Sequence, residues 1–465
     1  MKRKIISLLL AIAMLALPLL ATTSCGLFGN NDDGKLHITF YHTMGANLTK
    51  VLDQYKAIFE QRYPNVVIDH KQVGGYDDVR DQIKTDILTG EQPNIAYCYP
   101  DHVALYNKAN VVMTLDDMIA STDTVTYADG TTEQVGLTQA QIDNFIDAYY
   151  EEGKIYGDGK MYTLPMSKST EVLYYNKDFF AKHNLEVPTT WVEMEEVCAK
   201  IKAIENDCIP LGYDSEANWF ITMCEQMKSD YTSSEGEHFL FDNETNRNFI
   251  ATFRSWYEKG YVTTQEISGA YTSKLFTMKP EEKGNCYMCI GSSAGAAHQI
   301  PKDTNTGEIM FEVGIAPIPQ YDAENQKAIS QGPSLCIFKK ASQEEMLYSW
   351  LFVKLLTTNE DFQAAFGMAS GYMPVLENIN EHPIYKEELA LADGKDNLAM
   401  LSAKVALEQA DTFYTSPAFN GSSVARDQVG ALVQFCMTDP SAATAAGIKK
   451  AFEDAIKECK HQIGQ

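Results

Sequence analysis

The chain has 465 residues, of which 45% are hydrophobic and 11% are aromatic, and its formal net charge is −25 at pH 7. This apolar content excludes an intrinsically disordered chain, and the length predicts two lobes or more. The acidic balance argues against nucleic acid as a partner and against docking by charge on an anionic membrane surface.

The first residues have the pattern of an export signal. Three basic residues at 2–4 precede an apolar run at 5–21, and small residues then lead to Cys25. The run is short for a spanning helix and contains Pro18. The cysteine resembles that of a bacterial lipobox, so we expect cleavage after residue 24 and a diacylglycerol on Cys25. This anchor would hold the protein on the outer face of the cell membrane or in the periplasm. An ordinary cleaved signal, with Cys25 as an incidental residue, is the alternative.

Alternating strands and helices are predicted after a polar tether at residues 25–35. The hydrophobic periods predict, in chain order, a strand at 36–42, a helix at 48–59, a strand at 66–68, a helix at 79–88 and a strand at 94–99. This order is typical of a parallel sheet built from βαβ units, and therefore of an α/β fold.

A second set of elements begins near residue 160. Extended segments are predicted at 162–165, 171–175, 285–290, 313–319 and 334–338. Thr190 with Glu193, and Ser342 with Glu345, have the spacing of residues that cap the start of a helix. The last hundred residues are predicted to be mostly helical.

One motif is typical of an enzyme. Residues 291–295 read G-x-S-x-G between a predicted strand and a helix, which would make Ser293 the nucleophile of a serine hydrolase. That mechanism needs an acid and a histidine later in the chain, and His298, His382 and His461 are poorly placed for it. Small residues at a helix N-terminus can instead present N–H groups and hydroxyls to a ligand. We therefore expect no enzyme.

The cysteines do not indicate a metal site. Of the ten cysteines, nine would remain beside a lipidated Cys25, so at least one is unpaired. Cys286 and Cys289 form a lone C-x-x-C without a second pair or a close histidine. Small buried side chains explain these cysteines better. No cofactor-binding motif is found either, so we expect neither a metal nor a cofactor.

Several residues are candidates for binding a solute. His42 is at the C-terminal end of the first strand, where ligands of α/β sheets lie, although a buried histidine would show the same pattern. Tyr76 follows a glycine turn, and Trp219 and Tyr372 are among small polar residues. Aromatic platforms beside hydrogen-bonding groups suit a sugar, whereas simple packing is the alternative for each of them.

Sequence blocks spread over the chain carry a resemblance. The blocks are FYHTMG at 40–45, GGY at 74–76, LPMSKSTEVLYYNKDFF at 164–180, VPTTW at 187–191, MCIGSSAG at 288–295 and SGYMPV at 370–375. In this order they resemble the family 1 extracellular solute-binding proteins of ABC importers. The resemblance covers nearly the whole chain after residue 24.

The resemblance implies a two-lobed, type II periplasmic-binding-protein-like fold that closes on its ligand at a hinge. By similarity, lobe one comprises 36–145 plus 313–355, and lobe two comprises 146–312 plus 356–465. It also implies a monomer that hands its solute to the transmembrane subunits of an ABC permease. A cell-surface adhesin with the same fold and no permease remains an alternative.

The resemblance also implies ligand-binding positions. They match Tyr76, Ser169, Ser292 or Ser293, Gly332 and Tyr372, with an acidic contact near Asp101 and an arginine for which Arg426 is the nearest candidate. A mono- or oligosaccharide needs no fixed charge, whereas a phosphate needs a guanidinium. We therefore expect a carbohydrate-binding lipoprotein, with glycerol-3-phosphate or its diesters as the alternative ligands.

Overall fold

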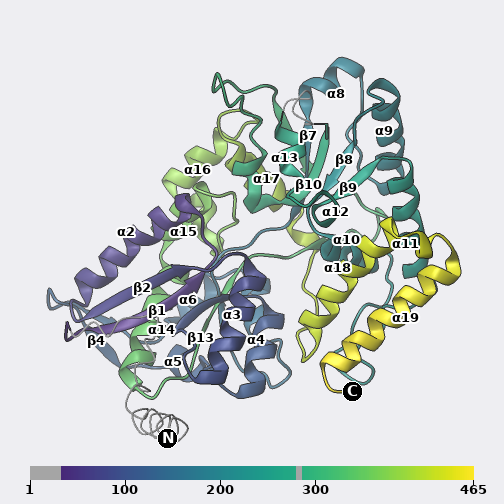
Figure 1. Cartoon of the computed structure of the whole chain (residues 1–465). Coiled ribbons are helices and arrows are strands. Elements are labelled where there is room, and N and C mark those ends of the chain that lie inside the picture. Colours follow the sequence, from purple (N-terminus) through teal and green to yellow (C-terminus); the bar gives the residue numbers. More distant parts are fainter. Residues whose placement is uncertain (1–32, 279–284) are drawn as a thin grey trace, which may run out of the picture.

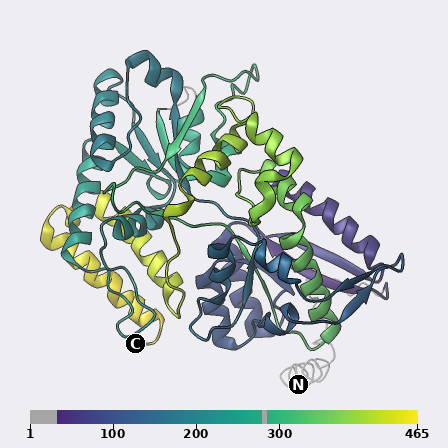
Figure 2. The same ribbon diagram turned by 180° about the vertical axis from the view of Figure 1, so that it is seen from behind.

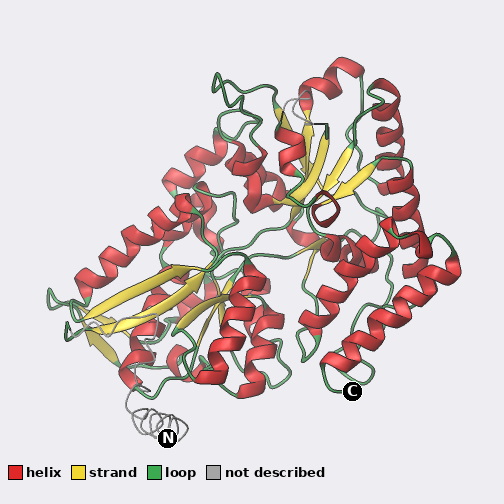
Figure 3. Ribbon diagram, viewed as in Figure 1, coloured by secondary structure: helices red, strands yellow, loops and turns green. Residues whose placement is uncertain are grey.

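The computed structural model describes residues 33–278 and 285–465, so the predicted signal peptide and Cys25 lie outside the described residues. The described chain forms two α/β lobes, each built around a five-stranded sheet (Figures 1 and 3). No helix within these ranges is long and apolar enough to span a membrane.

The sheet of the first lobe has the strand order β2-β1-β3-β13-β6. Its strands are β1 (Leu36–His42), β2 (Val66–Gln72), β3 (Ile95–Cys98), β13 (Ser334–Ile337) and β6 (Thr163–Pro165). As predicted, β1 is parallel to both β2 and β3. β13 is antiparallel to β3 and β6, so a late segment of the chain completes this sheet.

Helices cover this first sheet, and their ends follow local capping rules. The helices are α2 (Ala46–Arg62), α3 (Tyr76–Thr89), α4 (Pro100–Tyr106), α5 (Asp116–Ile119), α6 (Gln139–Asp143), α7 (Asp147–Glu151), α14 (Gln343–Thr358) and α15 (Glu360–Met368). α3 ends at Gly90, whose φ of 77° no other residue adopts as easily. The hydroxyl of Ser342 accepts the backbone N–H of Glu345 and starts α14 as predicted.

The sheet of the second lobe has the order β11-β7-β10-β8-β9. Its strands are β11 (Val313–Pro317), β7 (Glu171–Asn176), β10 (Met288–Ser292), β8 (Leu211–Tyr213) and β9 (Val262–Thr264). β7 is antiparallel to β10 and β11, whereas β8 is parallel to β10 and β9. Two small sheets add β4 (Thr124–Thr126) with β5 (Thr132–Gln134), and β12 (Ala328–Ile329) with β14 (Phe413–Tyr414).

The second lobe contains a large aromatic core beneath its helices. The helices are α8 (Lys177–His183), α9 (Trp191–Ile204), α10 (Glu216–Gln226), α11 (Glu244–Glu258), α12 (Gln265–Ser268), α13 (Ser273–Thr277), α17 (Leu398–Glu408), α18 (Ser422–Thr438) and α19 (Ala445–Gln462). Trp219 is fully buried and stacks on Phe253 at 3.6 Å between ring centroids. Thr190 and Glu193 form the predicted capping box of α9.

Three extended segments connect the lobes and lie side by side. Backbone bridges join Lys168 to Met373 and Ser169 to Gln331. Gly332, next to Gln331, has a φ of +97°, and a Cβ there would lie 2.4 Å from the backbone oxygen of Ser167. The connecting segment around Gln331 therefore needs a glycine at position 332 to run this close to the connecting segment around Lys168.

The predicted lobe boundaries are wrong at three places. β6 pairs with β13 in the first sheet, so the chain leaves the first lobe after Pro165 and not after residue 145. β11 pairs with β7 in the second sheet, so residues 313–317 do not belong to lobe one. α15 belongs to the first lobe, where Phe362 packs edge-on against Tyr55 of α2. Figure 2 shows α14 and α15, in green, against the purple and blue elements of this lobe. Periodicity predicts a strand or helix but not the sheet that it joins.

Candidate functional site

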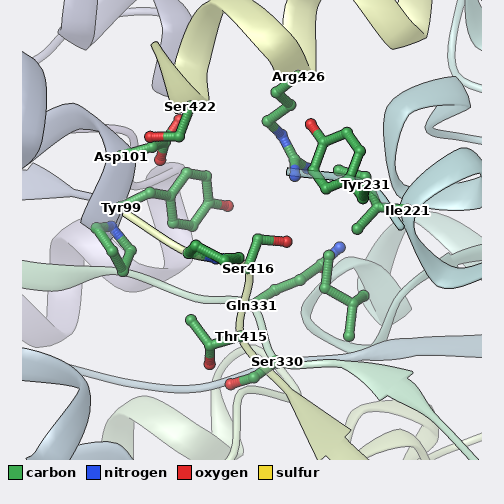
Figure 4. Close-up of a pocket in the computed structure, with 13 residues that line it drawn as sticks. Tyr99, Asp101, Ile221, Tyr231, Ser330, Gln331, Thr415, Ser416, Ser422 and Arg426 are labelled. Atoms are coloured by element: carbon green, nitrogen blue, oxygen red, sulfur yellow. The ribbon is translucent and has the colours of Figure 1, made fainter. Parts of the chain in front are cut away.

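A pocket opens between the two lobes beside the connecting segments (Figure 4). Its empty space is about 570 Å³ when the part that is open to solvent is included. The first lobe contributes Tyr99, Pro100 and Asp101, from the end of β3 and the start of α4. The other lining residues are Ile221, Tyr231, Ile329, Ser330, Gln331, Thr415, Ser416, Pro417, Ser422 and Arg426. The position at the carboxyl end of β3 is the usual place for a ligand in an α/β sheet.

Arg426 extends from the first turns of α18 into this pocket, toward Tyr231 (Figure 4). Its Nη2 donates a hydrogen bond to the side-chain oxygen of Asn218. Among the described residues, no carboxylate forms an ion pair with Arg426. Burial lowers the pKa of Arg426, but Asp101 and the nearby tyrosines outweigh this effect and raise it, so the side chain stays charged. The pocket therefore offers a guanidinium whose charge no direct contact neutralises.

Asp101 contributes a carboxylate on the opposite lobe. Its Oδ2 accepts a hydrogen bond of 2.8 Å from the hydroxyl of Ser423. Burial alone would raise its pKa, but His102, Arg426 and the Ser423 hydroxyl together hold the pKa of Asp101 below its usual value. The carboxylate of Asp101 therefore stays ionised in the pocket wall.

Three buried hydroxyls in the pocket wall have no hydrogen-bond partner within the described part of the chain. They belong to Tyr231, Ser330 and Ser416. Tyr231 is only 7% exposed, so water reaches little of this residue. Buried hydroxyls in folded proteins are nearly always hydrogen-bonded, because an unmet one costs about 1–3 kcal/mol. A solute with several hydroxyl groups can satisfy all three.

A wall of tyrosines continues the pocket on the side of the first lobe. Tyr76 stacks on Tyr99, with ring centroids 4.4 Å apart and planes 25° apart. The hydroxyl groups of Tyr76 and Tyr372 are 3.0 Å apart. Tyr76 and Tyr372, both predicted from the sequence, are therefore neighbours and support Tyr99, which lines the pocket itself.

Polar contacts join the two lobes around the pocket. Asp101 of the first lobe binds Ser423 of α18, as described above. Arg80 of α3 forms an ion pair of 3.3 Å with Asp427, also on α18. The Thr415 hydroxyl donates a hydrogen bond of 3.2 Å to Glu152. These contacts cross from one lobe to the other, so the two lobes are in contact and the structure represents a closed conformation.

Two predicted solute contacts are core residues instead. His42 is fully buried, its Nε2 lies 2.9 Å from Nδ1 of His70, and its Nδ1 accepts the backbone N–H of Met44. Burial, with a smaller effect of His70, lowers the pKa of His42 to about 3, so it is neutral. Trp219 is part of the aromatic core of the second lobe. Neither residue lines the pocket. The sequence could not show this, because a strand end or a helix face has the same residue pattern whether it faces the core or a cleft.

Ser292 and Ser293, both predicted to bind the solute, also lie outside the pocket, and the alternative role of Ser293 as a hydrolase nucleophile does not hold. Ser293 is fully buried, and its hydroxyl accepts the backbone N–H of Thr170 at 3.2 Å. The hydroxyl of Ser292 accepts the N–H of Ala294 and caps the 3-10 helix η4 (Ser293–Gln299). In the described part of the chain, no histidine is hydrogen-bonded to either hydroxyl, so neither serine has the base that a nucleophile needs.

The remaining predicted residues belong to the connecting segments. Ser169 exchanges two backbone hydrogen bonds with Gln331, of 2.9 and 2.8 Å. Gly332 allows these segments to approach, and Gln331 beside it lines the pocket. Of the predicted set, Asp101 and Arg426 line the pocket, Tyr76 and Tyr372 flank it, and Ser169 and Gly332 pack behind it.

The cysteines form neither disulfides nor a metal centre in the described chain. Nine of them are buried free thiols there. Burial raises the pKa of both Cys286 and Cys289, so both remain protonated. Residues 33–278 and 285–465 contain no group of three or more metal-ligating side chains.

Several pocket residues were missed in the sequence. Tyr99 directly follows β3, and the rule that ligands lie at the carboxyl ends of strands indicates it as clearly as it indicated His42. Gln331 adjoins the predicted Gly332. Tyr231 and Ser416 are in irregular segments without a periodic pattern, so nothing local distinguishes them from surface residues.

Comparisons with known proteins agree with this architecture. UgpB of Salmonella typhimurium, an sn-glycerol-3-phosphate-binding periplasmic protein, is 25% identical over 364 residues, covering 73% of this chain and 74% of the relative. UgpB from Mycobacterium tuberculosis, solved with glycerophosphocholine, has a TM-score of 0.72 at 17% identity and covers 92% of this chain and 98% of its own. Listeria monocytogenes Lmo0181, an ABC substrate-binding protein solved with cycloalternan, has a TM-score of 0.72 at 17% identity, covering 92% of this chain and 99% of its own.

The predicted fold and the predicted class are both confirmed. The solved relatives share the two-lobed, type II architecture over nearly the whole described chain. The family model of bacterial extracellular solute-binding proteins matches residues 54–393, and members of this family bind solutes and are not enzymes. The chain therefore belongs to the bacterial extracellular solute-binding proteins.

Proposed function

We propose that this protein captures a carbohydrate, a mono- or oligosaccharide, between its lobes and delivers it to the transmembrane subunits of an ABC permease. The observation that carries the proposal is the set of unpartnered hydroxyls of Tyr231, Ser330 and Ser416 in a pocket that both lobes line. A sugar presents many hydroxyl groups on an apolar ring, which suits these hydroxyls and the ring of Tyr99. The solved relative bound to cycloalternan supports the same class of ligand.

A second candidate solute is glycerol-3-phosphate or one of its diesters. Arg426 favours it, because a guanidinium without an ion-pair partner suits a phosphate oxygen. Two relatives support this candidate: the sn-glycerol-3-phosphate-binding UgpB of Salmonella typhimurium and the Mycobacterium tuberculosis UgpB solved with glycerophosphocholine. The two candidates share the pocket and differ in the charge of the solute.

The remaining parts of the proposal concern the anchor and the assembly. We expect residues 1–24 to be removed, a diacylglycerol on Cys25, and a monomer held on the outside of the cell membrane. Mass spectrometry of the N-terminal peptide from membranes checks the anchor. An unmodified Cys25 in that peptide would overturn it.

A solute panel tests the ligand class. Thermal unfolding of the protein from Gly26 onward is measured with maltose, maltotriose, sn-glycerol-3-phosphate and glycerophosphocholine. A solute at 100 times its dissociation constant stabilises the folded protein by about 2.7 kcal/mol, which shifts the melting temperature measurably. A shift with a neutral sugar supports the carbohydrate, and a shift only with the phosphates supports the second candidate. No shift with any of the four would count against both.

Arg426→Gln tests which candidate depends on charge. For a phosphate-bearing solute we expect the affinity to fall by about 100-fold, because a charge-assisted hydrogen bond contributes about 1.5–3 kcal/mol. For a neutral sugar we expect a fall of about tenfold or less. Isothermal titration calorimetry measures both. Arg247→Gln is the matched control, because Arg247 pairs with Asp242 on the same lobe but does not line the pocket. Unchanged affinity in Arg426→Gln would exclude a role for this residue.

A further inference from the structure

A chain of buried hydrogen bonds leads from the pocket into the second lobe. Arg426 donates to the side-chain oxygen of Asn218. The amide nitrogen of Asn218 in turn donates to Oε1 of Glu171 at 3.0 Å. Oε2 of Glu171 accepts a hydrogen bond of 2.6 Å from the hydroxyl of Tyr213. Residues of β7, α10 and β8 thus hold the guanidinium that α18 carries.

The direction of these bonds fixes the amide of Asn218. An asparagine side chain has one acceptor end and one donor end. The carboxyl oxygen of Glu171 accepts from the amide NH2 group of Asn218, so the amide oxygen of Asn218 faces Arg426. This orientation fits the guanidinium, which can only donate hydrogen bonds. Asn218 is 4% exposed and Glu171 is 1% exposed, so water does not compete for either contact. Neither residue lines the pocket, and the hydrogen-bond chain reaches it at Arg426.

The charge of Glu171 depends on its surroundings. The charged and titratable groups that face it are Tyr213, Asp214, Tyr414 and Arg426. Burial raises the pKa of Glu171 to about 7, and this effect outweighs the hydrogen bonds from Tyr213 and Asn218 and the charge of Arg426, which lower the pKa. The carboxyl group therefore gains its charge as the pH rises through neutrality.

We propose that Glu171 and Asn218 are positioning residues that aim Arg426 into the pocket, and that the charge on Glu171 sets how strongly Arg426 binds an anionic group of the solute. The proposal rests on the proposed function in the case where the solute that enters this pocket carries a negative charge. The anionic group is a singly charged oxyanion on a polyhydroxylated solute, either the carboxylate of a sugar acid or the phosphodiester of a glycerol derivative.

The sign of the pH dependence follows from Coulomb's law. Below neutrality Glu171 is protonated, and Arg426 acts on the solute with its full positive charge. Above neutrality the carboxylate of Glu171 partly offsets that charge through one intervening amide, so an anion binds less tightly. By linkage, binding of the anion takes up a proton at Glu171. A neutral solute has no such dependence.

The test measures the dissociation constants of glycerophosphocholine, glucuronate and maltotriose at several pH values. The phosphate of glycerophosphocholine and the carboxylate of glucuronate keep their charge over this range, so only the protein titrates. With the anionic solute that binds, we expect the dissociation constant of the wild-type protein to rise about tenfold from about pH 5.5 to about pH 8.5. Which of the two anions binds identifies the source of the oxyanion.

Glu171→Gln separates this effect from a purely structural role. The variant keeps the size of the side chain and removes its charge, so we expect a flat pH profile with tight binding at the alkaline end. A merely structural role predicts an equal loss of affinity at every pH. Glu216→Gln is the matched control, because Glu216 is also buried and is on α10 with Asn218, but it bonds to the backbone N–H of Glu266. A wild-type pH profile in Glu171→Gln would overturn the proposal.

A measurement without solute distinguishes failure of this proposal from failure of the proposed function. The infrared C=O band of a buried, protonated carboxyl group should fade in the wild-type protein as the pH rises through about 7, and it should be missing in Glu171→Gln. In Arg426→Met the band should persist to higher pH, because the cation that favours the charged form is gone. If Arg426→Met leaves the pH dependence of this band unchanged, Glu171 and Arg426 are not coupled and the proposal fails. This result does not depend on whether any solute of the panel binds.

Discussion

Replacing Lys168 by methionine is expected to lower the free energy of unfolding by ~3–5 kcal/mol, because it leaves a buried carboxylate without its partner. Lys168 is in the first connecting segment and pairs with Glu152, and the two side chains are 1% and 5% exposed. Glu152 also accepts the Thr415 hydroxyl from the pocket wall. Urea unfolding followed by circular dichroism measures the loss.

The double variant Glu152→Gln with Lys168→Met is the informative comparison. It removes both charges, so we expect it to recover a large part of the stability that Lys168→Met loses. Lys449→Met is the surface control, because Lys449 pairs with Glu453 in exposed positions on α19, and we expect a change of about 0.5 kcal/mol or less. If Lys168→Met cost no more than this control, the pair would not be buried as described.

Replacing Gly332 by alanine is expected to cost ~3 kcal/mol of stability and to weaken solute binding. The cost combines a backbone conformation unfavourable to any side chain with a clash between the added Cβ and the backbone of the first connecting segment. The added Cβ would lie 2.4 Å from the oxygen of Ser167 and 2.8 Å from the Cα of Lys168. Relief requires the two connecting segments to separate, which would move Gln331 in the pocket wall.

Gly236→Ala separates the two contributions. Gly236 has a φ of +69°, yet nothing lies within 4 Å of the position that its Cβ would occupy. This variant therefore carries the backbone strain without the clash, and we expect a loss of about 1–2 kcal/mol with unchanged solute affinity. Denaturant unfolding and calorimetry of both variants check the difference. Equal losses in the two variants would show that the connecting segments are not packed tightly at Gly332.

The individual elements were predicted well because their signals are local. β1 has the predicted bounds, since the period of two that predicts a strand is a property of neighbouring residues alone. The capping boxes at Thr190 and Ser342 start helices for the same reason, because a cap involves residues three positions apart. The lobe boundaries failed where strands as far apart as β6 and β13 form one sheet, a pairing that no local pattern encodes.

Among the residues of the site, too, local rules predicted some positions and could not predict others. Local rules placed Tyr76 on a turn and Tyr99 at the end of a strand, although only the first was selected. The same rules could not separate His42, which the core of the first lobe covers, from Tyr99, which lines the pocket. Burial of a strand end depends on which distant segments cover it, and segments as far along the chain as α18 face Tyr99 across the pocket.

The sequence by itself determined the class of protein, the order of its strands and helices, and the family to which it belongs, because these depend on local patterns and on motifs that keep their order along the chain. Only the tertiary structure decided that Asp101 and Arg426 line the same pocket, that Ser293 is buried without a base, and that Glu171 reaches Arg426 through Asn218. These relations come from contacts between residues far apart in the chain, which form only when the two lobes pack around their connecting segments.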